Sequence, residues 1–293
     1  RELNHVRPAF EDLLARLRTD HVELGMIHYV DACDELRAIM DGPFIEYVRE
    51  LLAAGKIGHI GLSTHNPEVA LLACDEPEIE VIMFSLNPAF DMMPASEDLE
   101  DLFGDYENVA GDGIEPTRAR LYARAEEADV SLTVMKGYAG GRLLSADASP
   151  FGVALTPVQC IHYALTRPAV ASVMVGVETV EQLEEALAYE RATAAERDYA
   201  SVLAAAPKHA YMGQCIYCGH CAPCTVGINI ALSNKFADLA EMAGEVPASV
   251  AAHYEAMDVT AGACIACGDC EPRCPFDVPI VERMEAAEKL FGC

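Results

Sequence analysis

The amino-acid sequence predicts an α/β fold over residues 1–207, followed by a small and mostly helical domain over residues 208–293. Two observations lead to this prediction. Over residues 8–190, short apolar runs alternate with longer amphipathic segments, which is typical of repeated strand and helix units. Beyond residue 208 the strand pattern stops, and eight of the 12 cysteines lie within residues 215–274.

The first elements are predicted from apolar spacing and from residues that favour helix ends. Phe10 and Leu13 recur at helical spacing and indicate a first helix. Gly55 suits the end of the next helix, and Asn66 followed by Pro67 suits the start of the one after it. In chain order, the expected elements are a helix that ends near residue 20, a strand over 22–30, a helix over 44–54, a strand over 57–63, a helix over 66–74 and a strand over 79–86.

The later elements follow from the same signals. Pro116 suits a first helical turn, and Thr156 and Thr179 suit the N-cap positions of two further helices. A long loop is expected over 87–113 and a linker over 198–208. The remaining expected elements are a helix over 115–128, a strand over 131–136, a helix over 156–166, a strand over 171–175, and helices over 180–189, 228–242 and 247–257.

The predicted strands are short, buried and separated by helices. Such strands are expected to run parallel, with their functional loops at the carboxyl ends. A closed (β/α)8 barrel contains eight strands, whereas an open doubly wound sheet is complete with about five or six. Because the pattern yields five strands, periodicity alone leaves both architectures open.

Charge and hydropathy limit the expected classes of partner. The chain carries 20 basic and 47 acidic residues, which gives a formal net charge of -27. Such a charge repels nucleic-acid backbones and anionic lipid surfaces, so neither nucleic acid nor a membrane is an expected partner. The simplest interpretation is that the negative charge keeps the protein soluble, and the alternative is that it attracts a cationic partner. No run approaches the roughly eighteen consecutive apolar residues of a membrane-spanning helix.

The spacing of the clustered cysteines is typical of metal ligands. Cys264 begins a C-x2-C-x2-C-x3-C run that is followed by Pro275, the signature of a 4Fe-4S cluster. Cys215 begins a second C-x2-C-x2-C run with Cys224 after it, although Thr225 stands where proline is usual. The predicted ligands of two 4Fe-4S clusters are Cys215, Cys218, Cys221, Cys224, Cys264, Cys267, Cys270 and Cys274.

Three thiolates at such close intervals cover one face of a cluster, and in two-cluster proteins the fourth ligand comes from the opposite motif. The expected ligand sets are Cys215, Cys218 and Cys221 with Cys274, and Cys264, Cys267 and Cys270 with Cys224. The alternative is structural zinc, which typically uses two separated C-x2-C pairs. The cysteines expected to be free thiols are Cys33, Cys74, Cys160 and Cys293. Eight thiolate ligands indicate a reducing cytoplasm.

Five stretches of the first region, in this order, resemble the aldo-keto reductase superfamily. They are LRTDHVELGMIHYVD, GKIGHIGLSTHN, VIMFSLNPAFD, SLTVMKGYAGGRLL and SVMVGVETVEQLEEAL. The strings CIYCGHCAPC and CIACGDCEPRCPF resemble the ferredoxin domain of the iron-sulfur branch of that superfamily. The resemblance implies a (β/α)8 TIM barrel, of which this chain holds about five of the eight strands, followed by a small, mostly helical ferredoxin-type domain.

The resemblance also implies roles for residues near the strand ends. His28 matches the family's catalytic histidine, which hydrogen-bonds the substrate carbonyl; from the residues alone, a structural histidine at a strand end is the alternative. Ser63, His65 and Asn66 match the positions that hold the nicotinamide carboxamide. The other matching cofactor-binding positions are Asn87 after the next strand, Lys136 and Gly137 near the pyrophosphate, and Gly176, Gln182 and Glu185 on the adenine side.

The sequence departs from the family pattern in three ways. The family's catalytic aspartate, tyrosine and lysine belong to strands that precede Arg1, so this chain is expected to lack them and to be the C-terminal portion of a longer enzyme. Gln182 stands where a basic residue often holds the 2'-phosphate, and Glu178 lies nearby, so NAD is favoured over NADP. Ala186 replaces the usual asparagine. FMN is an alternative ligand of the same phosphate-binding loops.

The function implied by both regions is an iron-sulfur oxidoreductase. The barrel reduces a small carbonyl-type substrate with nicotinamide, while two 4Fe-4S clusters exchange electrons with a redox partner protein. Nicotinamide transfers two electrons together and each cluster transfers one, so a flavin or another converter is needed to join them. The two alternatives are an electron-transfer protein whose barrel is a docking scaffold, and a carbonyl reductase in which the clusters are purely structural.

Overall fold

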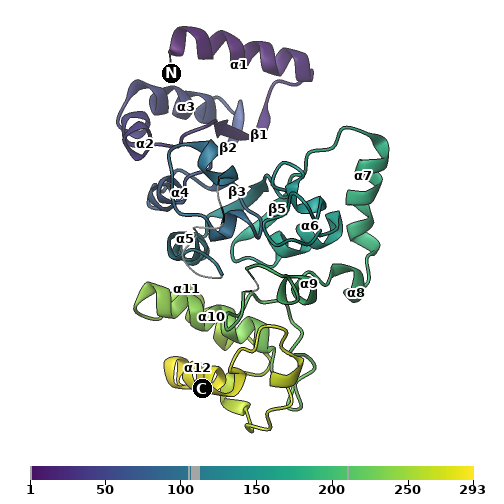
Figure 1. The fold of residues 1–293 in the computed structure, drawn as a ribbon. Helices are drawn as coiled ribbons and strands as arrows, with labels where there is room; N and C mark the ends of the chain where they lie inside the picture. The colour runs from purple at the N-terminus through teal and green to yellow at the C-terminus, as the bar shows by residue number, and fades with distance from the viewer. Residues whose placement is uncertain (1, 105, 107–112, 210) are drawn as a thin grey trace.

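One parallel sheet forms the centre of the first region of the molecule. The computed structural model describes residues 2–104, 106, 113–209 and 211–293 of the chain (Figure 1). The strands are β1 (Val22–Ile27), β2 (Ile57–Thr64), β3 (Val81–Ser85), β4 (Ser131–Met135) and β5 (Val170–Val173). Neighbouring strands pair in parallel, and their order in the sheet is β1-β2-β3-β4-β5, which is their order in the chain.

The strand order distinguishes the two architectures that periodicity left open. A doubly wound sheet reverses its strand order at a switch point, whereas each strand of a barrel lies beside the strand that precedes it. Among the described residues, the order runs in one direction from β1 to β5. The predicted α/β class, the five strands and their parallel direction are confirmed, and the winding is that of part of a (β/α)8 barrel.

Helices connect and cover these strands. They are α1 (Leu3–Leu17), α2 (Cys33–Met40), α3 (Pro43–Ala53), α4 (Pro67–Ala73), α5 (Pro116–Glu127), α6 (Pro157–Leu165), α7 (Val180–Leu187), α8 (Ala194–Arg197) and α9 (Ala200–Ala204). Proline occupies the first turn of α3 to α6, where a missing N–H group costs no helical hydrogen bond. The side chains of Asn66 and Thr156 accept hydrogen bonds from backbone N–H groups at the starts of α4 and α6.

The second region is mostly helical, as predicted. Its elements are α10 (Ile230–Ala243), α11 (Ala248–Glu255), two short 3-10 helices, η6 (Ala261–Ala263) and η7 (Glu271–Arg273), and α12 (Ile280–Phe291). Helix α10 packs against α11 and α12 within this region and against α5 of the first region (Figure 1). None of the helices that the structure describes is both long and apolar enough to cross a membrane.

Some elements differ from the sequence prediction. Helices α2, α8 and α12 were not predicted. Helices α2 and α8 span only eight and four residues, so each offers few positions at helical spacing. The predicted linker contains α9, whose Leu203 is buried. The loop predicted over 87–113 contains two 3-10 helices, η1 (Phe90–Met92) and η2 (Leu99–Phe103), while residues 105 and 107–112 of that loop lie outside the described residues.

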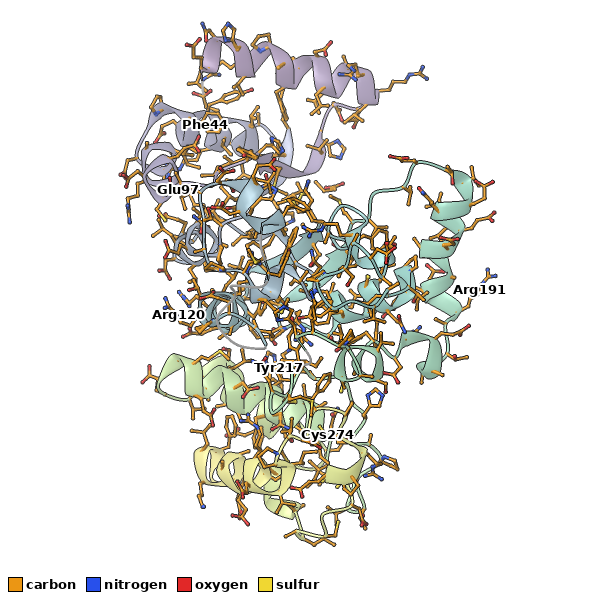
Figure 2. All side chains as sticks on the ribbon, viewed as in Figure 1. Phe44, Glu97, Arg120, Arg191, Tyr217 and Cys274 are labelled. Atoms are coloured by element: carbon orange, nitrogen blue, oxygen red, sulfur yellow. The ribbon has the colours of Figure 1, made fainter. Side chains whose placement is uncertain are left out.

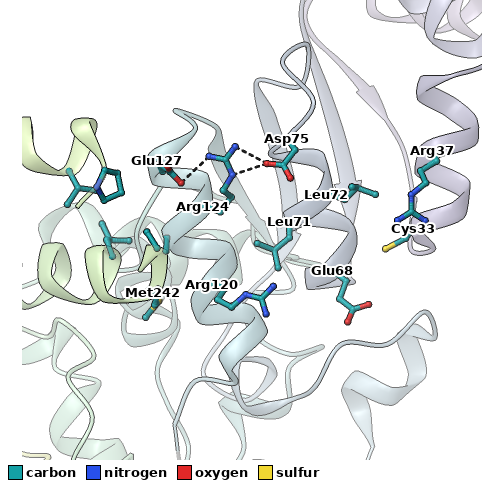
Figure 3. Close-up of a pocket in the computed structure, with 15 residues that line it drawn as sticks. Cys33, Arg37, Glu68, Leu71, Leu72, Asp75, Arg120, Arg124, Glu127 and Met242 are labelled. Carbon is teal, nitrogen blue, oxygen red and sulfur yellow. Dashed lines mark hydrogen bonds and ion pairs between the residues drawn. The ribbon is translucent and has the colours of Figure 1, made fainter. Parts of the chain in front are cut away.

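Glu126 near the end of α5 connects the two regions. One carboxylate oxygen accepts a hydrogen bond from Lys235 on α10 at 2.9 Å, and the other accepts from the backbone N–H of Ala169 at 2.6 Å, just before β5. A groove of about 490 Å³ lies between α2, α4 and α5 on one side and α10 and α11 on the other. Figure 3 shows Arg124 in this groove, with its guanidinium ion-paired to Asp75 and Glu127.

A fully buried group of polar side chains lies between the sheet and the second region. The Asp91 carboxylate accepts hydrogen bonds from the hydroxyls of Tyr122 on α5 and Tyr163 on α6, the latter at 2.6 Å. Arg118, also fully buried, donates to two backbone carbonyl oxygens at 3.0 and 3.1 Å. Burial raises the pKa of Asp91, and the positive charge of Arg118 acts against that shift. Oppositely charged groups are therefore buried together in this layer.

Candidate functional site

A cavity of about 570 Å³ lies at the carboxyl ends of β4 and β5. It is formed by the loop after β4, the loop and first turns after β5, and the first residue of α6. The predicted cofactor-binding residues that line it are Lys136, Gly137, Gly176, Gln182 and Glu185. The structure thus brings together residues that are far apart in the sequence, at the edge where parallel sheets bind their ligands.

The loop after β4 has an unusual backbone. Lys136, Gly140 and Gly141 have φ values of 61°, 65° and 87°, in the left-handed region that glycine tolerates best. Lys136 is exposed and lines the cavity, whereas Gly137 beside it is buried. The loop therefore turns tightly at the end of the strand and leaves one cationic side chain beside the cavity.

The opposite wall contains the start of α7. The hydroxyl of Thr179 accepts a hydrogen bond from the Gln182 backbone N–H at 3.3 Å, and the Gln182 side-chain oxygen accepts from the Glu178 backbone N–H at 2.7 Å. The N-terminus of a helix attracts anions, and so does Lys136 across the cavity. The carboxylates of Glu178 and Glu185 oppose any further negative charge. The cavity is thus suited to a ligand with one anionic part.

Ser63 and Asn87 are buried beneath the carboxyl ends of β2 and β3, outside the lining of this cavity. The Ser63 hydroxyl oxygen accepts a hydrogen bond from the Tyr29 backbone N–H at 2.7 Å. The Asn87 amide donates to the Lys136 carbonyl oxygen at 2.9 Å, while its oxygen accepts from two N–H groups of the following turn. In the described geometry both side chains hold neighbouring loops, and their predicted cofactor contacts stay predictions.

His65 and Asn66 are both held by Asp31, a residue that the sequence analysis did not single out. The Asp31 carboxylate lies 2.9 Å from Nδ1 of His65 and accepts hydrogen bonds from the His65 backbone N–H at 2.7 Å and the Thr64 hydroxyl at 2.9 Å. The Asn66 amide donates to the Asp31 carbonyl oxygen at 2.9 Å. The available signal was a carboxylate three positions after His28, just beyond a predicted strand.

His28 directly follows β1 and has an exposed side chain. Its ring centroid lies 6.1 Å from that of Tyr29, which lies 5.5 Å from that of His65. Tyr29 has a φ of 59°, so the chain turns sharply at the end of the strand. The structure thus places His28 at the same edge of the sheet as Ser63 and His65, and its catalytic role stays a prediction.

The contacts of Asp31 predict an acid-dependent loss of stability. Burial acts to raise the pKa of Asp31, but the hydrogen bonds from His65 and Thr64 outweigh it, and the pKa is lowered. A carboxylate with a lowered folded-state pKa stabilises the fold fully above its unfolded pKa of about 3.9, and this stabilisation is lost as pH falls through the folded value. Asp31→Asn is therefore expected to lower the free energy of unfolding at pH 7 by about 1–3 kcal/mol.

Chemical denaturation between pH 3 and pH 7 measures this effect. The free energy of unfolding of Asp31→Asn should fall less steeply with acid than that of the wild type, because the titrating carboxylate is gone. Asp34→Asn is the matched control, since Asp34 forms an exposed ion pair with Arg37, and it should resemble the wild type. Equal stabilities of the two variants at pH 7 would contradict the assigned role of Asp31.

The two cysteine loops of the second region have matching backbones. Tyr217 and Gly219 have φ values of 57° and 80°, and Ala266 and Gly268, at equivalent positions after the first cysteine, have values of 53° and 75°. Burial raises the pKa of Cys215, and the backbone N–H of Tyr217 in the first of these turns acts against that shift. Backbone N–H groups around thiolates are a feature of iron-sulfur sites.

The two cysteine motifs lie close to one another in the structure. One cavity is lined by Cys224 together with Cys264, Cys267 and Cys270. Cys274 lies near the other set: burial raises the pKa of Cys221 to about 11, and the neighbouring sulfurs of Cys218 and Cys274 add to that shift. Cys224 thus lies with the first three cysteines of the second motif and Cys274 lies near Cys218 and Cys221, while the complete ligand sets stay predictions. Figure 2 shows Cys274 in this region and Tyr217 closer to the first region.

The donor chemistry of these loops fits two cubane clusters. Burial raises the pKa of Cys215 to about 12, so the metal-free thiol is protonated at neutral pH and metal binding must release a proton. Burial also raises the pKa of Cys218, and the buried guanidinium of Arg167 acts against that shift. In the part of the chain that the structure describes, no three His, Cys, Asp or Glu side chains are grouped closely enough to hold a metal ion.

Thr225 occupies the position where the motif normally has proline. Its hydroxyl lies 3.7 Å from the Cys267 sulfur and 3.4 Å from a carboxylate oxygen of Asp269. The substitution therefore places a polar group beside a cysteine of the opposite motif. Among the cysteines outside the motifs, Cys74 and Cys160 are buried free thiols, and burial raises the pKa of each to about 12.

Comparison with known proteins gives two family matches. A sequence model of the aldo/keto reductase family matches residues 2–206, and a model of the 4Fe-4S dicluster domain matches residues 214–279. A search of curated proteins finds no match. Solved structures similar to the chain include an aldo-keto reductase from Bacillus halodurans, at 21% identity and a TM-score of 0.45, covering 66% of this chain and 64% of that one.

Another similar structure is a thermostable aldo-keto reductase solved with the inhibitor epalrestat, at 21% identity and a TM-score of 0.42, covering 66% of this chain and 64% of that one. The chain thus spans less than two thirds of the length of either reductase.

Proposed function

The chain belongs to the aldo/keto reductase family and carries a 4Fe-4S dicluster domain, and from this premise we propose that it is an iron-sulfur oxidoreductase acting on a small carbonyl-type substrate. The cavity beside β4 and β5 is assigned to nicotinamide dinucleotide, and the two cysteine loops to two clusters. The observation that most supports this assignment is the convergence of Lys136, Gly176 and Gln182, from separate elements, on one cavity.

The residues of the chain have distinct parts in the proposed reaction. When bound, nicotinamide supplies a hydride for the carbonyl carbon and each cluster supplies one-electron transfer. Lys136 and the N-terminus of α7 bind the anionic part of the cofactor, and Asn87 fixes the Lys136 backbone. His28 donates a hydrogen bond to the substrate oxygen and stabilises the negative charge that develops there. The acid that protonates this oxygen is assigned to the tyrosine that the family uses for this step.

We assign NAD rather than NADP to the cavity. The Glu178 carboxylate would repel an additional phosphate, and Gln182 brings no positive charge because its side chain is a neutral amide, whose oxygen accepts from the Glu178 backbone N–H. FMN is the alternative ligand, since its single phosphate meets the same charge requirement and its ring could join two-electron and one-electron steps.

Replacing Lys136 tests the cofactor site. Lys136→Met is expected to weaken NADH binding about tenfold, which is about 1.4 kcal/mol, because a charge-assisted contact to phosphate is lost. Fluorescence titration with NADH, NADPH and FMN measures the affinities and their order. Lys289→Met, which removes a lysine of α12 far along the chain, is the control and should bind like the wild type. Tighter binding of NADPH than of NADH would contradict the NAD assignment, and unchanged NADH binding in Lys136→Met would contradict the site.

The second candidate is an electron-transfer protein whose barrel region serves for docking. The exposure of the second cysteine loop favours it, because Ile265 is 61% exposed and Cys267 is also exposed. A cluster on this loop would be accessible to a redox partner, and the net charge of -27 suits a cationic one. Reversible cluster reduction without any nucleotide binding would favour this function. In either case the thiolate ligands suit the reducing cytoplasm.

A further inference from the structure

Arg167 is a buried cation at the junction between the two regions. It lies between α6 and β5, and only 3% of it is exposed. Its Nη2 atom donates a hydrogen bond to the carbonyl oxygen of Ile216, which stands between two cysteines of the first cysteine loop. The guanidinium carbon lies 4.5 Å from the ring centroid of Tyr163 and 5.3 Å from that of Tyr217. A permanent positive charge is therefore held directly against the loop.

The charge of Arg167 has no directly bonded carboxylate. Among the residues that the structure describes, no Asp or Glu forms an ion pair with it, and its Nε and Nη1 atoms lack a hydrogen-bond partner. The Asp91 charge acts on it at longer range, but two tyrosine hydroxyls already bond that carboxylate. A buried cation without a bonded anion is strongly unfavourable. The site therefore lacks a nearby negative charge.

A cluster on the first cysteine loop would supply that negative charge. Four thiolates give a 4Fe-4S cluster a net negative charge, and the charge grows by one when the cluster accepts one electron from a one-electron donor. In a buried site, a nearby cation stabilises the more negative state more strongly. No proton accompanies the electron at this residue, because arginine stays protonated in proteins.

We infer that Arg167 raises the reduction potential of the cluster held by Cys215, Cys218, Cys221 and Cys274. Arg167 is a positioning residue for the loop and an electrostatic one for the cluster. This inference rests on the cluster-binding part of the proposed function. It predicts that the two clusters differ in reduction potential. The cause is a charge that belongs to the first region, because Arg167 stands just before β5.

The second cysteine loop provides a matched comparison. Ile265, the equivalent of Ile216, is exposed, whereas Ile216 is fully buried. Arg273 also donates hydrogen bonds to backbone carbonyl oxygens, those of Cys221 at 2.7 Å and Pro223 at 2.8 Å, but it is exposed. Water and salt screen an exposed charge. Arg273 is therefore the control cation, with a similar contact but a weaker expected effect.

The test compares the wild-type chain with Arg167→Gln, Arg167→Lys and Arg273→Gln, all purified anaerobically with their clusters. Gln keeps an N–H donor for the Ile216 carbonyl but removes the charge, whereas Lys keeps the charge. Iron and sulfide are measured first, and an EPR-monitored redox titration then gives the potential of each cluster. In Arg167→Gln, the reduction equilibrium constant of one cluster should fall at least tenfold, about 59 mV for one electron, while the other cluster is unchanged.

Arg167→Lys and Arg273→Gln should stay close to the wild type. Wild-type potentials for both clusters in Arg167→Gln would overturn the inference and leave the proposed function intact. Equal shifts in Arg167→Gln and Arg167→Lys would also overturn it, because the charge would then not be the cause. If Arg167→Gln is purified without the cluster of the first motif, Arg167→Met is titrated instead. If that cluster is absent from both variants, the inference is overturned, and Arg167 is needed to assemble the cluster rather than to set its potential. A wild-type chain without iron and sulfide would overturn the proposed function itself.

Discussion

Substituting Cys274 with serine is expected to remove the cluster of the first motif rather than that of its own motif. Cys274 lies near Cys218 and Cys221, whereas Cys224 lines a cavity with the first three cysteines of the second motif. The iron content should therefore fall from about eight to about four atoms per chain in either single variant, Cys274→Ser or Cys224→Ser, with the opposite cluster lost in each.

Double variants show which cluster is lost. If the ligands are exchanged between motifs, Cys264→Ser combined with Cys274→Ser removes both clusters, while Cys264→Ser combined with Cys224→Ser removes only one. Iron and sulfide analysis with EPR of the reduced protein distinguishes these results. Cys293→Ser removes an exposed thiol outside the motifs and is the control. Retention of about four iron atoms in the Cys264/Cys274 double variant would show that each motif binds its cluster alone.

Replacing Asp91 with asparagine is expected to lower the stability of the first region. The carboxylate is fully buried, receives two tyrosine hydroxyls and opposes the buried charge of Arg118. Asparagine offers one acceptor oxygen in place of two, so one buried tyrosine hydroxyl loses its acceptor, which costs about 1–3 kcal/mol. Asp91→Asn should therefore lower the free energy of unfolding at pH 7 by about that amount.

Urea denaturation of the cluster-loaded protein under anaerobic conditions measures this loss. Asp75→Asn is the control, because Asp75 forms its ion pair with Arg124 at the exposed edge of a groove and should stay close to the wild type. A loss below about 1 kcal/mol for Asp91→Asn would mean that the carboxyl is already neutral in the fold, since its pKa is raised by burial.

Local signals in the sequence were sufficient for most of the fold. Proline in the first helical turn and side-chain caps such as Asn66 and Thr156 act within a few residues, so they mark helix starts without knowledge of the fold. Helix α2 was missed because its eight residues offer few positions at helical spacing and its stability comes from packing on α3 and α4. The strand order also needed the structure, because pairing is a contact between distant segments.

The candidate site shows the same division between local and distant contacts. The cysteine motifs are local, so their ligand types were visible in the sequence, and the resemblance supplied the residues that line the cavity. Asp31 and Arg167 were not identified, because each acts through partners more than thirty positions away: His65 for Asp31 and Ile216 for Arg167. Asp31 gave only a weak signal, a carboxylate three positions after His28, and nothing near Arg167 in the sequence marks that residue. Long-range hydrogen bonds of this kind are visible only after folding.

The two hydrogen bonds of Glu126 affect how mutations in α10 should be interpreted. Glu126 ties Lys235 of that helix to the backbone just before β5, and the carboxyl end of the same strand leads into the Gly176 side of the cavity. The four residues of β5 span only about 13 Å. A substitution at Lys235 is therefore expected to change the ligand affinity of the proposed cofactor cavity through the position of β5. Position 235 therefore offers a test of whether the second region acts on this cavity, without changing any residue assigned to cofactor or cluster binding.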